Sequence, residues 1–182
     1  MAEGIKRKAE EIIGITSILA GIFSILILLT HSSWDRSPFT YTTQEIKNWG
    51  GIFGAYISDT LFNLVGIAAY LVPVAFVIYG TNRLLGLKKY RVKMAGITLL
   101  MIAVSIIMSL ANDNFDLELH ATATGLVGLT VGTILRKFLS VPGAYIIALS
   151  LVFSSIILLI PVTVESIVKK MKEQEKRKKP QK

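Results

Sequence analysis

The 182-residue sequence contains no cysteine and only two histidines, His31 and His120. The absence of cysteine excludes disulfides, thiolate zinc sites and cysteine nucleophiles, and two histidines leave little material for a metal site or a catalytic triad. Glycine-rich phosphate-binding motifs and the H-E-x-x-H zinc motif are also missing. We therefore expect no catalytic residue, no cofactor site and no metal site in this chain.

Charged residues make up only 18% of the chain, whereas about a quarter of a typical soluble domain is charged. Hydrophobic residues make up 52% and fall in uninterrupted runs. Residues 12–30 carry no charge, and a helix of this length spans about 28 Å, close to the hydrocarbon thickness of a bilayer. The run 50–82 contains one charge, Asp59, and is too long for a single span, so it is divided into an interfacial helix and a span.

These runs predict an all-α integral membrane protein with four transmembrane helices and short interfacial or re-entrant helices on the outer side. The apolar segment 121–135 is too short for a comfortable span and is assigned to the third loop. The predicted segments are the N-terminus 1–11, span 12–30, outer loop 31–59 with an interfacial helix at 49–58, span 60–82, basic loop 83–93, span 94–111, outer loop 112–139, span 140–164 and basic tail 165–182.

The distribution of lysine and arginine predicts the orientation. With four spans and both ends in the cytoplasm, sixteen basic residues lie inside and four outside, as the positive-inside rule requires. A fifth span through 121–135 would place the eight basic residues of the tail outside. The tail has too little apolar content to fold alone and is typical of a linker. The two halves of the sequence show no clear internal symmetry.

Asp59 and Asn63 are four residues apart, so they share one helix face. Three interpretations remain open: they cap a break between the interfacial helix and the second span, they form a polar contact with a neighbouring helix or subunit, or they bind an ion. Glycines spaced for close helix approach are found at 50–54 and 125–132, and they fit packing within the chain or a subunit interface. The spans carry no Lys, Arg or Glu at mid-depth, which argues against a transporter or pump.

The second run contains Asn48-Trp49-Gly50-Gly51, then Gly54-Ala55 and Asp59, and continues with Gly66, Ala69-Tyr70-Leu71 and Pro73. This pattern resembles the N-terminal membrane domain of the FtsK/SpoIIIE family of bacterial DNA translocases, and later glycines resemble the family's later motifs. Family members carry a Gly/Ala-rich stretch with an Asp, followed by a span with a Gly, an Ala-Tyr-Leu and a Pro. The candidates for the family motif and for helix packing, taken together, are Asn48, Gly51, Gly54, Ala55, Asp59, Asn63, Gly66, Tyr70, Pro73, Gly125, Gly128 and Gly143. The family's later motif opens with paired glycines, whereas here Thr124 precedes Gly125.

The resemblance implies a membrane-anchoring, septum-localising and assembly domain of an ATP-driven translocase that links chromosome segregation to cell division. Its expected location is the bacterial inner membrane at the division septum, and its expected partners are the lipid bilayer, other division proteins and further copies of itself. ATP, Mg²⁺ and DNA would bind only to the motor, which this chain lacks. Two alternatives remain open, a standalone multi-pass scaffold and a small channel or transporter.

Overall fold

The computed structural model describes residues 2–87, 90–115 and 121–160. All regular structure in these residues is helical. Four helical segments are long and apolar enough to cross a membrane, namely Gly4–Leu29, Gly51–Leu84, Tyr90–Asn114 and Ala123–Leu159. The predicted fold class, an all-α membrane protein with four spans, is therefore confirmed.

The first half of the chain is a long helix, a loop, a short helix and a second long helix. Helix α1 (Ala2–Leu29) is followed by α2 (Gly51–Val65), a 3₁₀ turn η1 (Gly66–Tyr70) and α3 (Leu71–Leu84). The interfacial helix predicted at 49–58 is thus the first part of α2. The break before the span lies at Gly66 and not at Asp59, because Gly66 has φ 64° and ψ −144°, a conformation that only glycine adopts readily.

The second half begins with α4 (Tyr90–Phe115) and ends with α5 (Ala121–Leu159). Helix α5 is not continuous, because Gly125 and Ser140 have non-helical dihedral angles. Most of the predicted outer loop 112–139 is therefore helical, and the apolar segment 121–135 is the start of a short helix that leads into the last span. Pro142 lies in the first turn after the Ser140 kink, where its missing N–H costs no hydrogen bond. Pro161 and the tail 165–182 lie outside the described residues.

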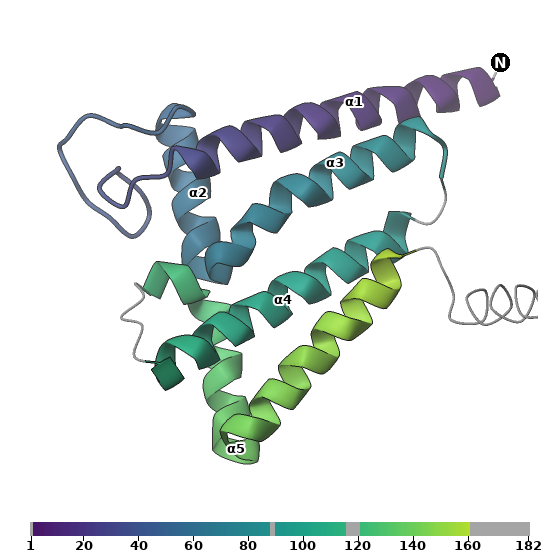
Figure 1. The fold of residues 1–182 in the computed structure, drawn as a ribbon. Coiled ribbons are helices and arrows are strands. Elements are labelled where there is room, and N and C mark those ends of the chain that lie inside the picture. Colours follow the sequence, from purple (N-terminus) through teal and green to yellow (C-terminus); the bar gives the residue numbers. More distant parts are fainter. Residues whose placement is uncertain (1, 88–89, 116–120, 161–182) are drawn as a thin grey trace, which may run out of the picture.

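The two halves have the same architecture, contrary to the expectation of no internal symmetry. In each half a short helix lies between two residues with positive φ, Gly51 (62°) and Gly66 (64°) in the first half and Gly125 (69°) and Ser140 (55°) in the second. The members of both pairs are fifteen positions apart. Figure 1 shows α2 and the start of α5 lying in corresponding places beside the two pairs of long helices.

The long helices confirm the correspondence between the halves. In the first half, a Cβ at Gly80 of α3 would contact the carbonyl oxygen of Gly14 on α1. In the second half, Ser155 of α5 donates a hydrogen bond to the carbonyl oxygen of Gly96 on α4, 2.7 Å away. Gly14 therefore corresponds to Gly96 and Gly80 to Ser155. Few residues are identical at corresponding positions, so the sequence alone conceals the repeat.

The halves are not related by a twofold axis, because the contacts between them are one-sided. Helix α3 and turn η1 of the first half pack against α4, and α2 packs against α5. A twofold axis would also pair α1 with the last part of α5, but in the part of the chain that the structure describes α1 contacts only α2, η1 and α3. One half thus stacks on the next in the same orientation.

Two buried apolar clusters hold the helices together. The first contains Ile27, Leu28, Phe62, Val65, Ala68 and Ala69, with Met101, Val104 and Val127 of the second half packed against it. The second lies within the second half and contains Ile106, Leu110, Ala144 and Ala148. Because the first cluster takes side chains from both halves, it joins them.

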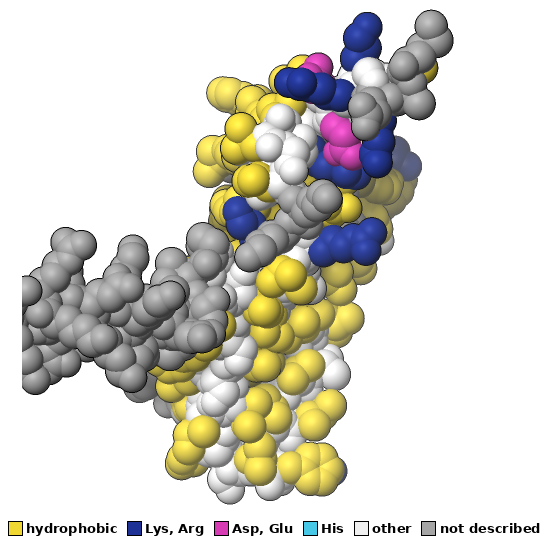
Figure 2. All heavy atoms as spheres, turned by 90° about the vertical axis from the view of Figure 1, so that its right-hand side faces the viewer, with side chains coloured by type: hydrophobic (Ala, Val, Ile, Leu, Met, Phe, Trp, Pro, Cys, Tyr) yellow, Lys and Arg dark blue, Asp and Glu magenta, His cyan; other side chains and the backbone are white. Residues whose placement is uncertain are grey.

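The long helices expose many apolar side chains, and charged side chains lie at the ends of the molecule, with Arg36, Glu45 and Lys47 exposed on the outer loop. The start of α1, the end of α3, the start of α4 and the end of α5 all lie at the same end of the molecule (Figure 1). Figure 2, which views this end, shows Lys, Arg, Asp and Glu side chains gathered in one part and hydrophobic side chains over the rest. Many large apolar side chains on α1 and α5 are exposed, as in a helix that faces lipid.

Candidate functional site

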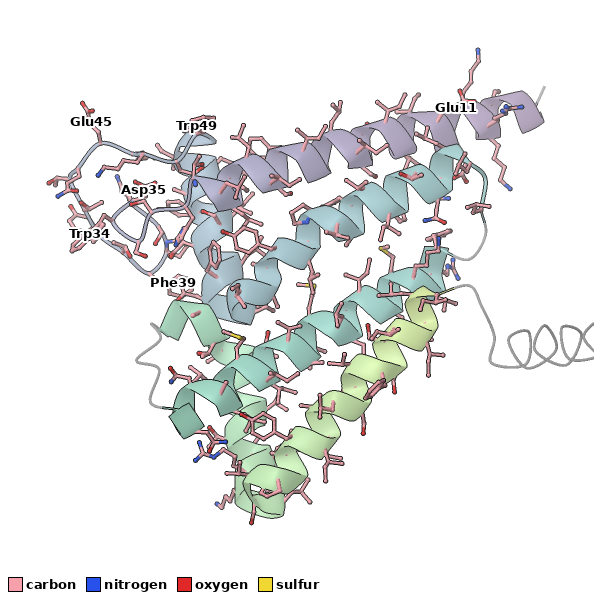
Figure 3. All side chains as sticks on the ribbon, viewed as in Figure 1. Glu11, Trp34, Asp35, Phe39, Glu45 and Trp49 are labelled. Atoms are coloured by element: carbon pink, nitrogen blue, oxygen red, sulfur yellow. The ribbon has the colours of Figure 1, made fainter. Side chains whose placement is uncertain are left out.

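A network of buried polar side chains fixes the outer loop to the helices. The carboxylate of Asp35, 3% exposed, accepts hydrogen bonds from the backbone N–H groups of Lys47 (2.9 Å) and Asn48 (2.8 Å). These bonds close the loop between α1 and α2. Figure 3 shows the loop with Trp34, Asp35, Phe39 and Glu45 at the end of the molecule opposite Glu11.

Asn48 connects this loop to both neighbouring helices. Its side-chain amide nitrogen donates to the carbonyl oxygen of Ile27 (2.8 Å) and to Ser58 Oγ (3.3 Å), and its oxygen accepts from the Gly50 N–H (2.9 Å). Gly54 lies so close to Asn48 that a Cβ on Gly54 would overlap the amide oxygen. The glycine spacing at 50–54 therefore makes room for a side chain of the same half. Ala55 is buried one residue further on.

Asp59 is buried in the middle of α2 and accepts two side-chain hydrogen bonds. Ser37 Oγ of the outer loop donates to Asp59 Oδ2. Asn63 Nδ2 donates to Asp59 Oδ1 (3.1 Å) and to the Asp59 carbonyl oxygen (2.9 Å). The predicted common face of Asp59 and Asn63 is present, but the pair ties α2 to the loop and does not cap a helix break.

His31 joins the same network. His31 Nδ1 lies 3.3 Å from Ser58 Oγ, and its ring packs on Phe62 with centroids 4.6 Å apart. Nε2 is buried without a hydrogen-bond partner among the described residues. Burial lowers the pKa of His31 below its usual 6.5, an effect that the negative charges of Asp59 and Asp35 oppose.

Two other family-motif residues lie on the inner side of this network. The hydroxyl of Tyr70 is 3.4 Å from the carbonyl oxygen of Leu28, and its ring meets Phe62 edge-on with centroids 5.6 Å apart. Pro73 is fully buried, and a Cβ at Gly21 of α1 would contact its carbonyl oxygen. Both residues therefore hold α3 against α1.

A second feature is a backbone contact between the two halves. Gly66 and Gly125 abut, so a Cβ at Gly125 would overlap the Gly66 nitrogen and a Cβ at Gly66 would overlap the Ala123 carbonyl. Beside them, Ser105 Oγ of α4 donates to the carbonyl oxygen of Val65 (2.7 Å). Gly128 packs against the Ser105 carbonyl within the second half. These contacts bring Gly66 of the first family motif against Gly125 of the later glycine motif.

Two of the predicted site residues do not take part. Gly51 is exposed, and a Cβ there would meet no atom within 4 Å. A Cβ at Gly143 would meet only the side chain of Leu139. Conversely, Asp35, Ser37, Ser58 and Ser105 are buried parts of the site that the sequence did not single out. Ser58 and Ser105 could have been identified from the sequence, because small polar residues within apolar helices commonly lie at helix contacts.

The polar network and the glycine junction hold the helices and the outer loop together. Both buried carboxylates accept internal donors, and within the described residues no group of three or more His, Asp or Glu is placed to hold a metal ion. Comparison with known families then decides the identity. Residues 6–172 match the 4TM region of DNA translocase FtsK/SpoIIIE. The chain belongs to the FtsK/SpoIIIE family. It is a four-span membrane domain of that family.

Several curated FtsK proteins are similar to this chain. The DNA translocase FtsK of Rickettsia bellii is 31% identical over 121 residues, which cover 66% of this chain and 16% of the relative. The FtsK of Vibrio vulnificus is 28% identical over 152 residues (79% and 15%), and that of Shewanella oneidensis 28% over 182 residues (92% and 19%). The chain thus spans less than a fifth of the length of these FtsK proteins. No solved structure matches it.

Proposed function

We propose that this domain anchors a DNA translocase motor in the bacterial inner membrane, with both ends of the domain in the cytoplasm, and places the motor at the division septum. The motor, with its ATP, Mg²⁺ and DNA, would belong to a part of the protein other than these four spans. Four spans resist extraction far better than a lipid anchor, and a motor that pulls on DNA needs such a fixed point.

The observation that carries this proposal is that the basic residues gather at the end where the described chain begins and ends. Lys6, Arg7 and Lys8 lie on the first turns of α1. Nearby, Arg83 Nη1 is 2.6 Å from Glu10 Oε2 and its guanidinium lies over the ring of Tyr90. Basic residues flanking spans favour the cytoplasmic side, which supports a motor attached on that side.

The opposite end supports a role in contacts with other division proteins. Trp34, Phe39 and Tyr41 of the outer loop are 71%, 64% and 88% exposed, although Asp35 and Ser37 fix the loop backbone from beneath. Exposed aromatic rings on a backbone that is already ordered are typical of protein interfaces, because binding then costs little conformational entropy.

Localisation of a fluorescent fusion tests the proposal. With a fluorescent protein at the C-terminal end of this chain, we expect fluorescence in the inner membrane, concentrated at the septum of dividing bacteria. Replacing Trp34, Phe39 and Tyr41 with alanine should leave the fusion in the membrane and reduce its septal concentration. Replacing the exposed Phe153 and Ile157 of α5 with alanine is the matched control. Fluorescence in the cytosol would contradict anchoring, and even membrane fluorescence for all variants would contradict the septal role.

A further inference from the structure

Each half carries two surfaces, a kink and an edge. The contact within the chain pairs the kink of the first half with the edge of the second, so the edge of the first half and the kink of the second stay uncovered within the described ranges. The first half presents its kink at Gly66, which is buried against the edge Ala123–Gly125 of the second half. The second half has its own kink at Ser140, and the first half has its own edge at Trp49–Gly51. Because the halves stack in the same orientation, neither of these two surfaces meets the other half in the part of the chain that the structure describes.

The exposed fractions follow this pattern on the kink side. Val65, next to Gly66, is 7% exposed, whereas its counterpart Leu139, next to Ser140, is 46% exposed. Phe138, the preceding residue, is 77% exposed. The Ser140 kink therefore presents apolar side chains where the Gly66 kink has its contact. Ser140 also keeps a φ of 55°, which is unfavourable for a residue with a side chain.

The complementary pattern is found on the edge side. Thr124 and Gly125 are buried and Val127 packs against the first cluster. Of their counterparts on the first half, Gly50 is half-buried, Gly51 is exposed, and Phe53, the counterpart of Val127, is 66% exposed. Trp49 is 76% exposed at the same edge. The first half thus carries an uncovered version of the surface that the second half buries.

The long helices show the same asymmetry. Ile97 and Met101 of α4 lie in the groove beside α3, and Ile97 is only 3% exposed. The corresponding positions on α1, counted from Gly14 as from Gly96, are Ile15 and Leu19, which are 54% and 60% exposed. Helix α1 therefore presents an apolar row where α4 makes its contact with the preceding half.

We propose that a second copy of this chain binds head-to-tail, with its Ser140 kink seated on the Trp49–Gly51 edge of the first copy. The occupant is the same polypeptide because the second half's counterpart of this edge holds the Gly66 kink of this chain, and the Ser140 kink is uncovered among the described residues. A contact between unlike surfaces can be repeated indefinitely, so it builds rings or open chains and not closed pairs. This inference identifies surfaces for the assembly role that the family resemblance implies.

The internal contacts supply the residue pairs for the test. Ser105 Oγ contacts the Val65 carbonyl between the halves. On α1, Phe23 corresponds to Ser105 of α4, because each lies nine positions after the corresponding glycine, Gly14 or Gly96. Leu139 corresponds to Val65, because each directly precedes a kink. Phe23 of one copy should therefore meet Leu139 of the next. By the same correspondence with the Ala123–Gly66 contact, Trp49 should meet Ser140.

Cysteine cross-linking in membranes tests the proposal, since the native chain has no cysteine to interfere. Two differently tagged copies are expressed together, one with Phe23→Cys and the other with Leu139→Cys, and the membranes are oxidised. We expect a cross-linked product that carries both tags. A single chain with both substitutions should give a ladder of dimers, trimers and larger products. Trp49→Cys with Ser140→Cys is the second pair, should the first disturb folding.

The control pair is Phe23→Cys with Ile157→Cys, because Ile157 is also exposed (62%) but lies near the other end of the last span. It should not cross-link. Products that form only between two Phe23→Cys copies or two Leu139→Cys copies would overturn the head-to-tail contact in favour of a symmetric one. Absence of products from both test pairs, in chains that still fractionate with the membrane, would overturn self-association through these surfaces. Membrane anchoring is measured separately, by whether the chain fractionates with the membrane and by the location of the fluorescent fusion described above.

Discussion

Gly125 lies directly against Gly66, with no room for a side chain on either residue. Both have positive φ, 69° and 64°, and each starts or ends a short helix of a different half. The contact therefore combines two demands that only glycine meets, a left-handed backbone and the close approach of another backbone. It joins the two repeated halves of the domain.

Replacing Gly66 with alanine should lower the free energy of unfolding by at least about 2 kcal/mol, since the Cβ overlaps the Ala123 carbonyl in addition to straining the backbone. Gly51→Ala is the matched control, because Gly51 has nearly the same φ but open space around it. It should cost about 1 kcal/mol. Thermal unfolding in detergent measures both variants. Equal losses would show that the contact between the halves contributes nothing.

Replacing Asp59 with alanine should destabilise the domain by about 1–3 kcal/mol, because Ser37 and Asn63 lose their acceptor in a buried place. Asp113→Ala is the control. Asp113 pairs with Arg136, but both side chains are about a third exposed, so the expected loss is below about 1 kcal/mol. If Asp113→Ala proves the more damaging change in the same unfolding assay, the network around Asp59 is not what fixes the outer loop.

Replacing Ser105 with alanine should cost about 0.6 kcal/mol, a typical value for a hydrogen bond between helices in a membrane protein, since its bond to the Val65 carbonyl is lost. Ser150→Ala should be neutral within error, because Ser150 is exposed and its hydroxyl bonds only to the preceding turn of its own helix. Both are compared by unfolding in a denaturing detergent. A neutral Ser105→Ala would mean that backbone packing alone joins the halves.

Acid should destabilise the domain through His31. Burial lowers the pKa of His31 in the folded protein below 6.5, so the unfolded chain binds the proton more readily. The stability is therefore complete above about pH 6.5 and declines as the pH falls through the unfolded value toward the folded one. The variant His31→Gln should show a flatter dependence of unfolding temperature between about pH 7 and 5. A profile unchanged by this substitution would assign the acid sensitivity to other groups.

The apolar runs were sufficient to predict four spans because crossing a bilayer requires long uncharged helices whatever their packing. The position of the break in the second run was not predictable from charge. Asp59 attracted attention as the one charged residue, yet Ser37 and Asn63 satisfy it inside a continuous helix. Gly66 ends that helix, and its role depends on Ala123, a residue far away in the sequence.

The repeat and the outer network were hidden for a similar reason. Corresponding positions share backbone conformation and spacing rather than residue type, as Gly66 and Ser140 show. The family motif singled out Asn48 and Asp59, but their partners Asp35 and Ser37 lie in a loop whose polar residues resemble any solvated segment. Only the folded chain shows that these side chains are buried.

The most direct test of the proposed topology is the accessibility of single cysteines to a thiol reagent that cannot cross membranes. Glu45 lies on the outer loop and Glu11 at the opposite end of the molecule (Figure 3). Leu87 lines the same pocket as Glu11, and all three positions are exposed. In spheroplasts, we expect the reagent to label Glu45→Cys and to reach the other two only after the membrane is opened. Labelling of Glu11→Cys and Leu87→Cys in intact spheroplasts, with Glu45→Cys protected, would contradict the cytoplasmic location of both ends and with it the anchoring of a cytoplasmic motor.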